Sequence, residues 1–322
     1  MSRPPFMELL RERFRQGKYT CVGLDPDKEK LPEHLQTEDT QEIPTRFMHF
    51  GNAIAEATSE SVCAFKPNIA FYEAYGHNGI AVLSMTCEHI RKVAPEVPII
   101  LDAKRADIGN TNAGYVRELV EYFKADAITV SPYLGGETLK PFLKLKDKGI
   151  IVLCKTSNKG ADEFQNLPIP MTQATLKELG LPHGTMMELS GGPLLVYEYL
   201  ARRVAQFWNE NGNCCVVVGA TNPTRELARV RELVGVMPML IPGIGAQSET
   251  GNMEEDVQRV VEASFCTEEG KEGGIIVNAS RSTIYASSGK DFAEAAQAEA
   301  RKLNGLIVKF IPQPRLAGEA VS

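Results

Sequence analysis

The chain has 322 residues, of which 43% are hydrophobic and 24% are charged, so it can bury a sizeable core and falls in the range of ordinary globular proteins. Its formal net charge of −6 argues against nucleic acid or an anionic membrane as a partner, because such partners require clustered Lys and Arg side chains. Residues 1–14 contain no apolar run long enough for a signal peptide or a membrane span, which predicts a cytoplasmic protein. The seven cysteines contain no C-x-x-C motif, so we expect reduced thiols and neither a disulfide framework nor a zinc site.

Short apolar runs alternate along the chain with longer amphipathic stretches, a pattern typical of repeated βα units. The runs predict strands at residues 19–24, 61–65, 97–101, 127–130, 150–153, 214–218, 239–241 and 274–277. The stretches between them predict helices at residues 44–58, 79–93, 109–124, 138–148, 196–211, 224–234, 253–265 and 291–303. Most of the runs are continuously apolar, as expected of parallel strands that are buried on both faces. Eight such units close most simply into an α/β fold of the (β/α)8 TIM-barrel type, and we predict a single barrel domain over residues 1–322.

Two segments depart from this alternation. Residues 158–193 are rich in Gly, Pro and polar side chains and lengthen the connection after the fifth strand. We expect an insertion there that serves as a lid or a subunit contact. From about residue 304 the chain carries two prolines, and we expect a C-terminal tail on the surface.

Charged side chains gather where the second and third strands are expected to end. Active sites of such barrels lie at the C-terminal ends of the strands, and residues two apart on an extended segment point the same way. Asp102 and Lys104 should therefore both project into the barrel mouth, beside Lys66 from the neighbouring strand. Each pair of opposite charges could be worth about 4 kcal/mol at contact distance, which would keep both lysines protonated. The same array could instead be a structural ion-pair network at the rim.

Asp107 and Thr111 are four residues apart at the expected start of the third helix. They share one helix face and could be presented together to a ligand or to another subunit.

The loops after the seventh and eighth strands have the composition of a phosphate site. The glycine-rich turn at 243–247 offers unhindered backbone N–H groups ahead of a helix, and Arg281 follows the next strand. Together they match the usual phosphate site of barrels, although each alone could be a plain turn or a surface charge.

Two more strand ends carry polar side chains with two interpretations each. Asp25 could bind a sugar hydroxyl or serve as a turn residue before Pro26. Ser157 could donate a hydrogen bond to a polar ring or be an ordinary loop serine. The five histidines show no ligand spacing, so we predict no metal site and no catalytic histidine.

Four segments closely resemble the orotidine 5′-phosphate decarboxylase family. They are AFKPN at 64–68, LDAKRADI at 101–108, IPGIGAQ at 241–247 and SRS at 280–282. The resemblance runs in order along most of the chain, and the longer connections are similar to those of a bacterial subgroup. It implies a homodimer that converts orotidine 5′-phosphate to UMP and CO2 without a cofactor.

The resemblance also implies roles for individual residues. The catalytic array would comprise Lys66, Asp102, Lys104 and Asp107, with Lys104 protonating a vinyl carbanion at C6. Asp107 and Thr111 would reach into the site of the partner subunit. The implied substrate-binding residues are Asp25 at the ribose, Ser157 at the pyrimidine, Gln247 and Arg281 at the phosphate, and also Thr111 and Pro242. The chain departs from the family at Ser280, where a glycine is frequent, which leaves the backbone contact there open.

Three other functions are compatible with such a barrel. A Schiff-base aldolase would use Lys66 or Lys104 as a nucleophile, which requires a depressed lysine pKa that flanking aspartates oppose. A metal-dependent keto-sugar-phosphate decarboxylase or synthase would place Mg²⁺ among the carboxylates and would be inhibited by EDTA. A phosphate-binding barrel without catalytic activity would bind ligand without turnover.

Overall fold

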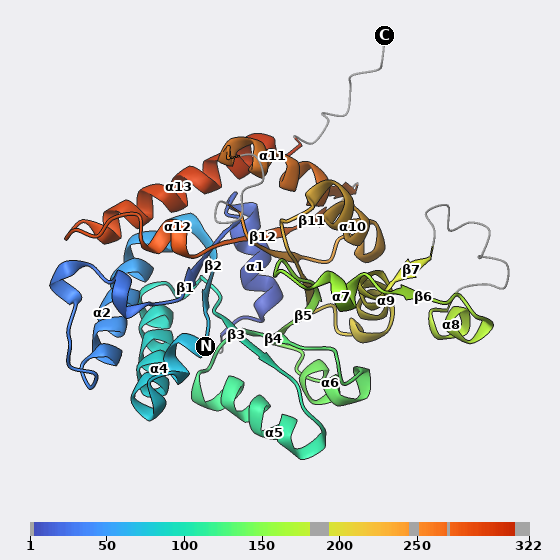
Figure 1. Cartoon of the computed structure of the whole chain (residues 1–322), viewed down its shortest axis with the longest axis horizontal. Helices are drawn as coiled ribbons and strands as arrows, with labels where there is room; N and C mark the ends of the chain where they lie inside the picture. Colours follow the sequence, from blue (N-terminus) through green and yellow to red (C-terminus); the bar gives the residue numbers. More distant parts are fainter. Residues whose placement is uncertain (1–2, 181–192, 245–250, 269–270, 313–322) are drawn as a thin grey trace, which may run out of the picture.

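The computed structural model describes residues 3–180, 193–244, 251–268 and 271–312 (Figure 1). Within them, eight parallel strands follow one another around a barrel in the order β2, β1, β12, β9, β8, β5, β4, β3. Bridges from Phe65 to Ile99 and from Asn68 to Asp102 join β2 to β3 and close it. The strands are β1 (Thr20–Leu24), β2 (Val62–Pro67), β3 (Ile100–Arg105), β4 (Ala127–Val130), β5 (Gly149–Lys155), β8 (Cys214–Val218), β9 (Met239–Pro242) and β12 (Ile275–Ala279). The predicted (β/α)8 barrel is thereby confirmed.

All eight predicted helices are present in the ring outside the barrel (Figure 1). They are α2 (Ile43–Thr58), α4 (Gly76–Val93), α5 (Gly109–Arg117), α6 (Gly136–Leu143), α9 (Val196–Arg203), α10 (Ala228–Val234), α11 (Met253–Ser264) and α13 (Phe292–Phe310). Wider π-helical turns extend three of them: η4 (Glu118–Tyr122), η6 (Val204–Trp208) and η7 (Pro223–Leu227). No helix of the described segments is long and apolar enough to cross a membrane.

Short elements fill the connections. The short helical segments are η1 (Lys28–Lys30), η2 (Glu33–Leu35), η3 (Ser59–Ser61), α3 (Ala70–Glu73), α7 (Asp162–Gln165), α8 (Gln173–Glu178) and α12 (Arg281–Ile284). Two antiparallel pairs lie outside the barrel: β6 (Pro168–Ile169) with β7 (Leu194–Leu195), and β10 (Cys266–Glu268) with β11 (Lys271–Gly273). The predicted insertion therefore contains α7, α8 and the β6–β7 pair, while residues 181–192 lie outside the described residues.

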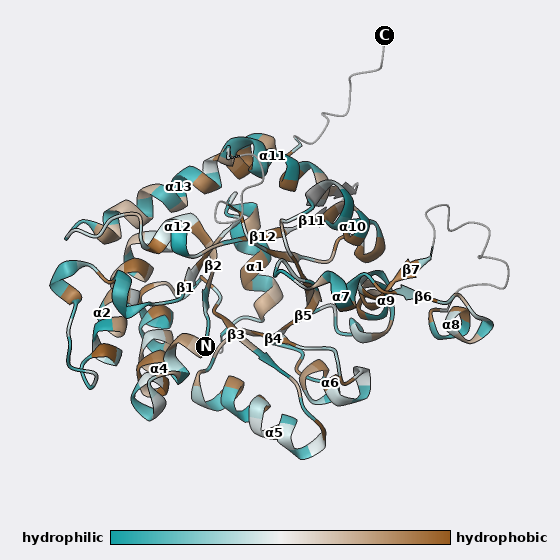
Figure 2. Ribbon diagram, viewed as in Figure 1, coloured by the Kyte–Doolittle hydropathy of each residue, from teal (hydrophilic) through white to brown (hydrophobic). Residues whose placement is uncertain are grey.

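Hydrophobic strands occupy the centre of the molecule, and the surrounding helices show one hydrophobic and one hydrophilic face (Figure 2). Every residue of β1, β4, β8 and β12 is buried. This two-sided burial explains why these strands appear in the sequence as continuous apolar runs.

Three boundaries differ from the sequence-based expectation. β3 starts later than predicted and continues through Arg105, because polar side chains remain compatible with a strand where it reaches the barrel mouth. α6 stops at Leu143, whose carbonyl accepts a hydrogen bond from the Asn211 side chain at 2.7 Å. α13 runs through Phe310, beyond the point where we predicted the tail to begin, since Leu303 and Ile307 extend its buried face.

The N-terminal helix α1 (Phe6–Arg15) was not predicted. It crosses the middle of the ring of strands in Figure 1 and covers their N-terminal ends. Its Phe6 ring lies against Gly149 of β5, and its Phe14 ring lies against Gly274 just before β12; a Cβ atom at either glycine would clash with the ring. The bottom of the barrel is thus sealed by two aromatic side chains.

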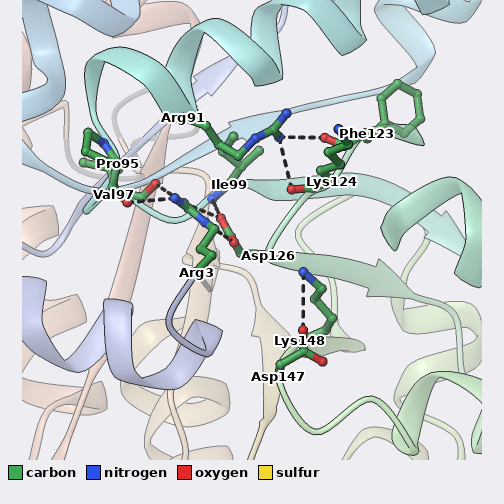
Figure 3. Close-up of polar contacts among 10 residues, drawn as sticks. All are labelled: Arg3, Arg91, Pro95, Val97, Ile99, Phe123, Lys124, Asp126, Asp147 and Lys148. Atoms are coloured by element: carbon green, nitrogen blue, oxygen red, sulfur yellow. Dashed lines mark hydrogen bonds and ion pairs between the residues drawn. The ribbon is translucent and has the colours of Figure 1, made fainter. Parts of the chain in front are cut away.

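Charged side chains bind backbone groups at the same end of the barrel (Figure 3). The Arg3 guanidinium contacts both carboxylate oxygens of Asp126, at 2.6 and 2.8 Å, and donates to the carbonyls of Pro95 and Val97. Asp126, which is buried, also accepts from the Ile99 backbone N–H at 2.8 Å. Such bidentate, charge-assisted contacts have a defined geometry and fix the starts of β3 and β4, whose other ends carry the polar residues.

Candidate active site

Lys66, Asp102 and Lys104 meet at the C-terminal ends of β2 and β3, as the sequence predicts. Lys66 Nζ lies 2.9 Å from Asp102 Oδ2, and Lys104 Nζ lies 2.7 Å from Asp102 Oδ1. The Thr129 hydroxyl of β4 also donates to Asp102 Oδ1, at 2.9 Å. Asp102 and Lys66 are buried, whereas half of the Lys104 side chain is exposed, so its ammonium group can reach a ligand in the barrel mouth.

The pKa shifts of Asp102 and Lys66 keep both of these groups charged. Burial by itself would raise the pKa of Asp102, but the ammonium groups of Lys66 and Lys104 hold it far below its usual range. Burial would likewise lower the pKa of Lys66, but Asp102 and then Asp25 raise it above its ordinary value. The cluster is thus an ion-pair group in which two ammonium groups share one carboxylate. A protonated Lys66 is a poor nucleophile, which argues against Schiff-base chemistry at this residue.

The backbone of Lys104 adopts a left-handed conformation, with φ of 48°. Few residues other than glycine do so, and the conformation persists only where the surroundings enforce it. Here the pairing of β3 with β4 shifts register between Leu101 and Arg105, and the Lys104 N–H donates to the Thr129 hydroxyl at 3.0 Å. The simple alternation that we used to place Asp102 and Lys104 together is therefore interrupted, although both side chains still meet.

Asp107 and Thr111 do not join this cluster. The Asp107 carboxylate accepts from the Ile108 backbone N–H at 2.6 Å, and its own N–H donates to the Asn112 side chain at 2.8 Å. Among the described residues, Asp107 forms no ion pair. Thr111 is exposed on α5. Within one chain the structure thus brings together three members of the predicted four-residue array.

The end of β1 contains a polar group that lacks a partner. Asp25 Oδ1 is buried and has no hydrogen-bond partner among the described residues. Gly23, two residues earlier, lies against both Asp25 and Ser280; a Cβ atom on it would approach Ser280 Oγ to 1.9 Å. The missing side chain at Gly23 therefore makes room for Ser280.

Three other predicted binding residues, Ser157, Pro242 and Arg281, lie at or just after the C-terminal ends of barrel strands. Ser157 follows β5 and lies against Gly219, where a Cβ atom would approach the serine Cβ to 2.6 Å. Pro242 ends β9, and its carbonyl accepts from the Ala220 N–H at 3.0 Å. Arg281 begins α12 and is exposed. Gln247 and the second glycine of its turn lie outside the described residues, so the structure does not test that half of the phosphate site.

Sequence reasoning missed several buried polar residues at these strand ends. Thr129 is the polar member of an otherwise apolar strand, a signal that could have identified it. Asn278 of β12 is buried, and its Oδ1 atom is unpaired among the described residues. Lys155 is buried at the end of β5, where its ammonium lies 2.5 Å from Asp162 and 3.4 Å from Glu226.

An open groove of about 590 Å³ lies on the flank of the barrel, between α6 and η6, with Lys144, Arg203 and Trp208 in its lining. It contains none of the strand-end residues, so we do not associate it with the cluster. Within the described segments, no group of three or more His, Cys, Asp or Glu side chains is arranged to hold a metal ion.

Residues 18–298 match the model of the family described as "Orotidine 5′-phosphate decarboxylase / HUMPS family". A protein of Azoarcus sp. (strain BH72) named orotidine 5′-phosphate decarboxylase is 44% identical over 296 residues, which cover 92% of this chain and 95% of that protein. A protein of the same name from Janthinobacterium sp. (strain Marseille) is 40% identical over 307 residues, covering 95% and 99%. The structure of Leishmania donovani OMP decarboxylase superposes with a TM-score of 0.71 at 32% identity, covering 94% of this chain and 98% of that one.

Replacing Asp102 by Asn should make the free energy of unfolding less dependent on pH under acidic conditions. Because the pKa of Asp102 is lower in the folded than in the unfolded protein, the ionised carboxylate stabilises the fold above the unfolded pKa of about 4. That contribution is lost as the pH falls from there toward the folded pKa. Below about pH 4, the unfolding free energy of the wild-type protein should therefore fall more steeply than that of Asp102→Asn, by up to about 1.4 kcal/mol per pH unit.

Urea unfolding of both proteins at a series of acidic pH values measures this difference. Asp147→Asn is the matched control, because Asp147 is largely exposed and its contact with Lys148, at 3.6 Å, lies at the other end of the barrel. It should keep the wild-type slope. Equal slopes for wild type and Asp102→Asn would mean that Asp102 is not the strongly ionised group described above.

Proposed function

The chain belongs to the orotidine 5′-phosphate decarboxylase family and decarboxylates orotidine 5′-phosphate to UMP and CO2, and we propose that Lys66, Asp102 and Lys104 carry out this step of pyrimidine biosynthesis. One observation carries the proposal. A half-exposed ammonium group, that of Lys104, is held 2.7 Å from a buried carboxylate at the mouth of the barrel, and Lys66 occupies the other oxygen of that carboxylate.

The charge distribution suits the chemistry of this reaction. When the bond from C6 to the carboxylate breaks, its electron pair stays on C6 as a vinyl carbanion with no conjugated group to accept it. The site must therefore stabilise the carbanion electrostatically, with groups that are oriented in advance. Lys104 then transfers an Nζ proton to C6, and the resulting neutral amine recovers a proton from solvent. Asp102 orients both ammonium groups, which together leave an excess positive charge near C6.

Other strand ends would hold the rest of the substrate. We assign Asp25 to a ribose hydroxyl, because its buried, unpaired Oδ1 atom requires a donor. Ser157 is assigned to the pyrimidine ring. Gln247 and Arg281 are assigned to the phosphate, whose binding energy is available to order the site even though it lies far from the reacting carbon. Pro242 is assigned a contact with the substrate.

The active form is proposed to be a homodimer in which Asp107 and Thr111 serve the partner's site. Both lie outside the cluster of their own chain. Around them the loops after β3 and β4 expose apolar side chains: Ile108 is 64% exposed, Tyr133 75% and Leu134 48%. Exposed large apolar side chains in these loops suit a surface that another protein covers, and the proposed two-fold axis places Asp107 opposite the Lys104 of a second copy.

We propose that the reaction needs no cofactor or metal ion, since the ammonium groups supply the positive charge. The relatives named orotidine 5′-phosphate decarboxylase cover nearly the whole chain, which favours this activity over a metal-dependent keto-sugar-phosphate decarboxylase or synthase. EDTA-treated protein should retain full turnover. The cytoplasmic location stays a prediction from the N-terminal sequence.

Lys104→Ala tests the assignment of the proton donor. Loss of a group that stabilises the carbanion and also protonates it should lower kcat/KM by at least about 10²–10⁴-fold. Affinity for UMP should fall far less, because the contribution is realised mainly in the transition state. The loss of ultraviolet absorbance of orotidine 5′-phosphate on adding EDTA-treated protein measures turnover. Lys144→Ala, on the flank groove, is the control and should be fully active. A Lys104→Ala variant that keeps more than about a tenth of wild-type turnover would remove Lys104 from the mechanism.

Mixing two inactive variants tests the shared site. If Lys104 acts in its own chain and Asp107 in the partner's, a heterodimer of Lys104→Ala and Asp107→Ala has one site with both lesions and one wild-type site. Random reassortment makes about half of the dimers mixed, so activity should recover to roughly a quarter of wild type.

Subunits must exchange for this result to be meaningful, so the variants are co-expressed and mixed dimers are verified by mass spectrometry. Heterodimers without recovered activity would show that Asp107 serves its own chain. Each variant assembled alone provides the baseline.

A further inference from the structure

The Thr129 side chain forms hydrogen bonds with both the Asp102 carboxylate and the Lys104 backbone. It is 1% exposed and belongs to β4, whose other residues are apolar. Its hydroxyl donates to Asp102 Oδ1 at 2.9 Å and accepts from the Lys104 backbone N–H at 3.0 Å. An ionised carboxylate can only accept, so the single hydroxyl proton must point to Asp102 and leave a lone pair for the N–H of Lys104. The Thr129 hydroxyl thus holds both the Asp102 side chain and the Lys104 backbone in place.

Thr129 binds the backbone of Lys104, which is in the left-handed conformation. Lys104 has a φ of 48° and lies where the pairing of β3 with β4 skips from Leu101 to Arg105. In a regular parallel pair the N–H groups donate to carbonyls of the adjacent strand. At Lys104 a side-chain hydroxyl is the acceptor in place of a carbonyl. Left-handed backbone outside glycine persists only where neighbouring groups enforce it, and Thr129 supplies such a contact.

We propose that Thr129 is a positioning residue for the decarboxylation. Its hydroxyl holds the backbone of Lys104 in the left-handed conformation and holds Asp102 Oδ1 toward the Lys104 ammonium. The ammonium is thereby aimed at the carbon from which CO2 departs. Threonine suits this task because branching at Cβ restricts its side-chain rotation. The inference rests on the proposed function of Lys104 and Asp102.

Because Thr129 is buried beneath the charged groups, it acts through them and has no surface to offer the substrate. Removing its hydroxyl should therefore slow the chemical step and leave substrate and product affinity nearly unchanged. A general loss of packing would instead weaken binding and catalysis together.

Thr129→Val removes the hydroxyl and keeps the shape of the side chain. A hydrogen bond to a charged group is worth about 1.5–3 kcal/mol, which corresponds to a decrease of roughly 10–100-fold in the single-turnover rate of orotidine 5′-phosphate. KM and the Kd for UMP should stay within about 3-fold of wild type, as expected for an effect confined to the chemical step. Thr129→Ser, which keeps the hydroxyl, should recover most of the rate.

Thr86→Val is the matched control. Thr86 of α4 is also fully buried, but its hydroxyl has no hydrogen-bond partner among the described residues. The same loss of a hydroxyl there should leave the single-turnover rate unchanged. If Thr129→Val does not yield a folded dimer, Thr129→Ala and Thr129→Ser are compared, since both lose the methyl group and only one loses the hydroxyl.

A wild-type rate in Thr129→Val while Lys104→Ala is inactive would overturn the role of Thr129 and leave the proposed function intact. Parallel losses of rate and UMP affinity in Thr129→Val would overturn it too, because they indicate a structural role. Full activity of Lys104→Ala would instead contradict the proposed function itself.

Discussion

The buried carboxylate of Asp102 is the group on which the site depends. An isolated charge at this depth would be costly, and it is tolerated because two ammonium groups and a hydroxyl bind its two oxygens. The Asp102 carboxylate in turn raises the pKa of Lys66 and so keeps this lysine protonated inside the protein. A cluster with one excess positive charge is thereby assembled before any ligand arrives, which is the condition for electrostatic stabilisation of a carbanion.

The barrel makes this cluster possible by bringing strands that are distant in sequence to one rim. Asn68 and Asp102 form a bridge where β2 and β3 close the barrel, so Lys66 and Asp102 are fixed by the same contact that completes the fold. The opposite end is fixed independently by α1 and by the contact of Arg3 with Asp126. The bottom of the barrel is therefore closed by packing and by a partly buried ion pair, whereas the Asp102 cluster and the left-handed backbone of Lys104 lie at the top.

Much of this could be predicted from the sequence, for identifiable reasons. Strands buried on both faces are continuous apolar runs, and their charged ends then locate Lys66, Asp102 and Lys104. The helix α1 was not predicted because its sequence is rich in charged residues. The burial of its Phe6 and Phe14 becomes apparent only in their packing against Gly149 and Gly274, which are far away in the sequence. The left-handed backbone of Lys104 and its bond to Thr129 depend on a register shift between strands, which no local pattern records.

Proton exchange at C6 of UMP tests the central claim most directly. If the ammonium of Lys104 protonates the C6 carbanion, microscopic reversibility requires that the same residue can remove the C6 proton of bound UMP. In D2O the wild-type protein should therefore introduce deuterium at C6 of UMP, as followed by NMR. Lys104→Ala should still bind UMP and should not catalyse the exchange. Exchange at the wild-type rate in Lys104→Ala would contradict the account.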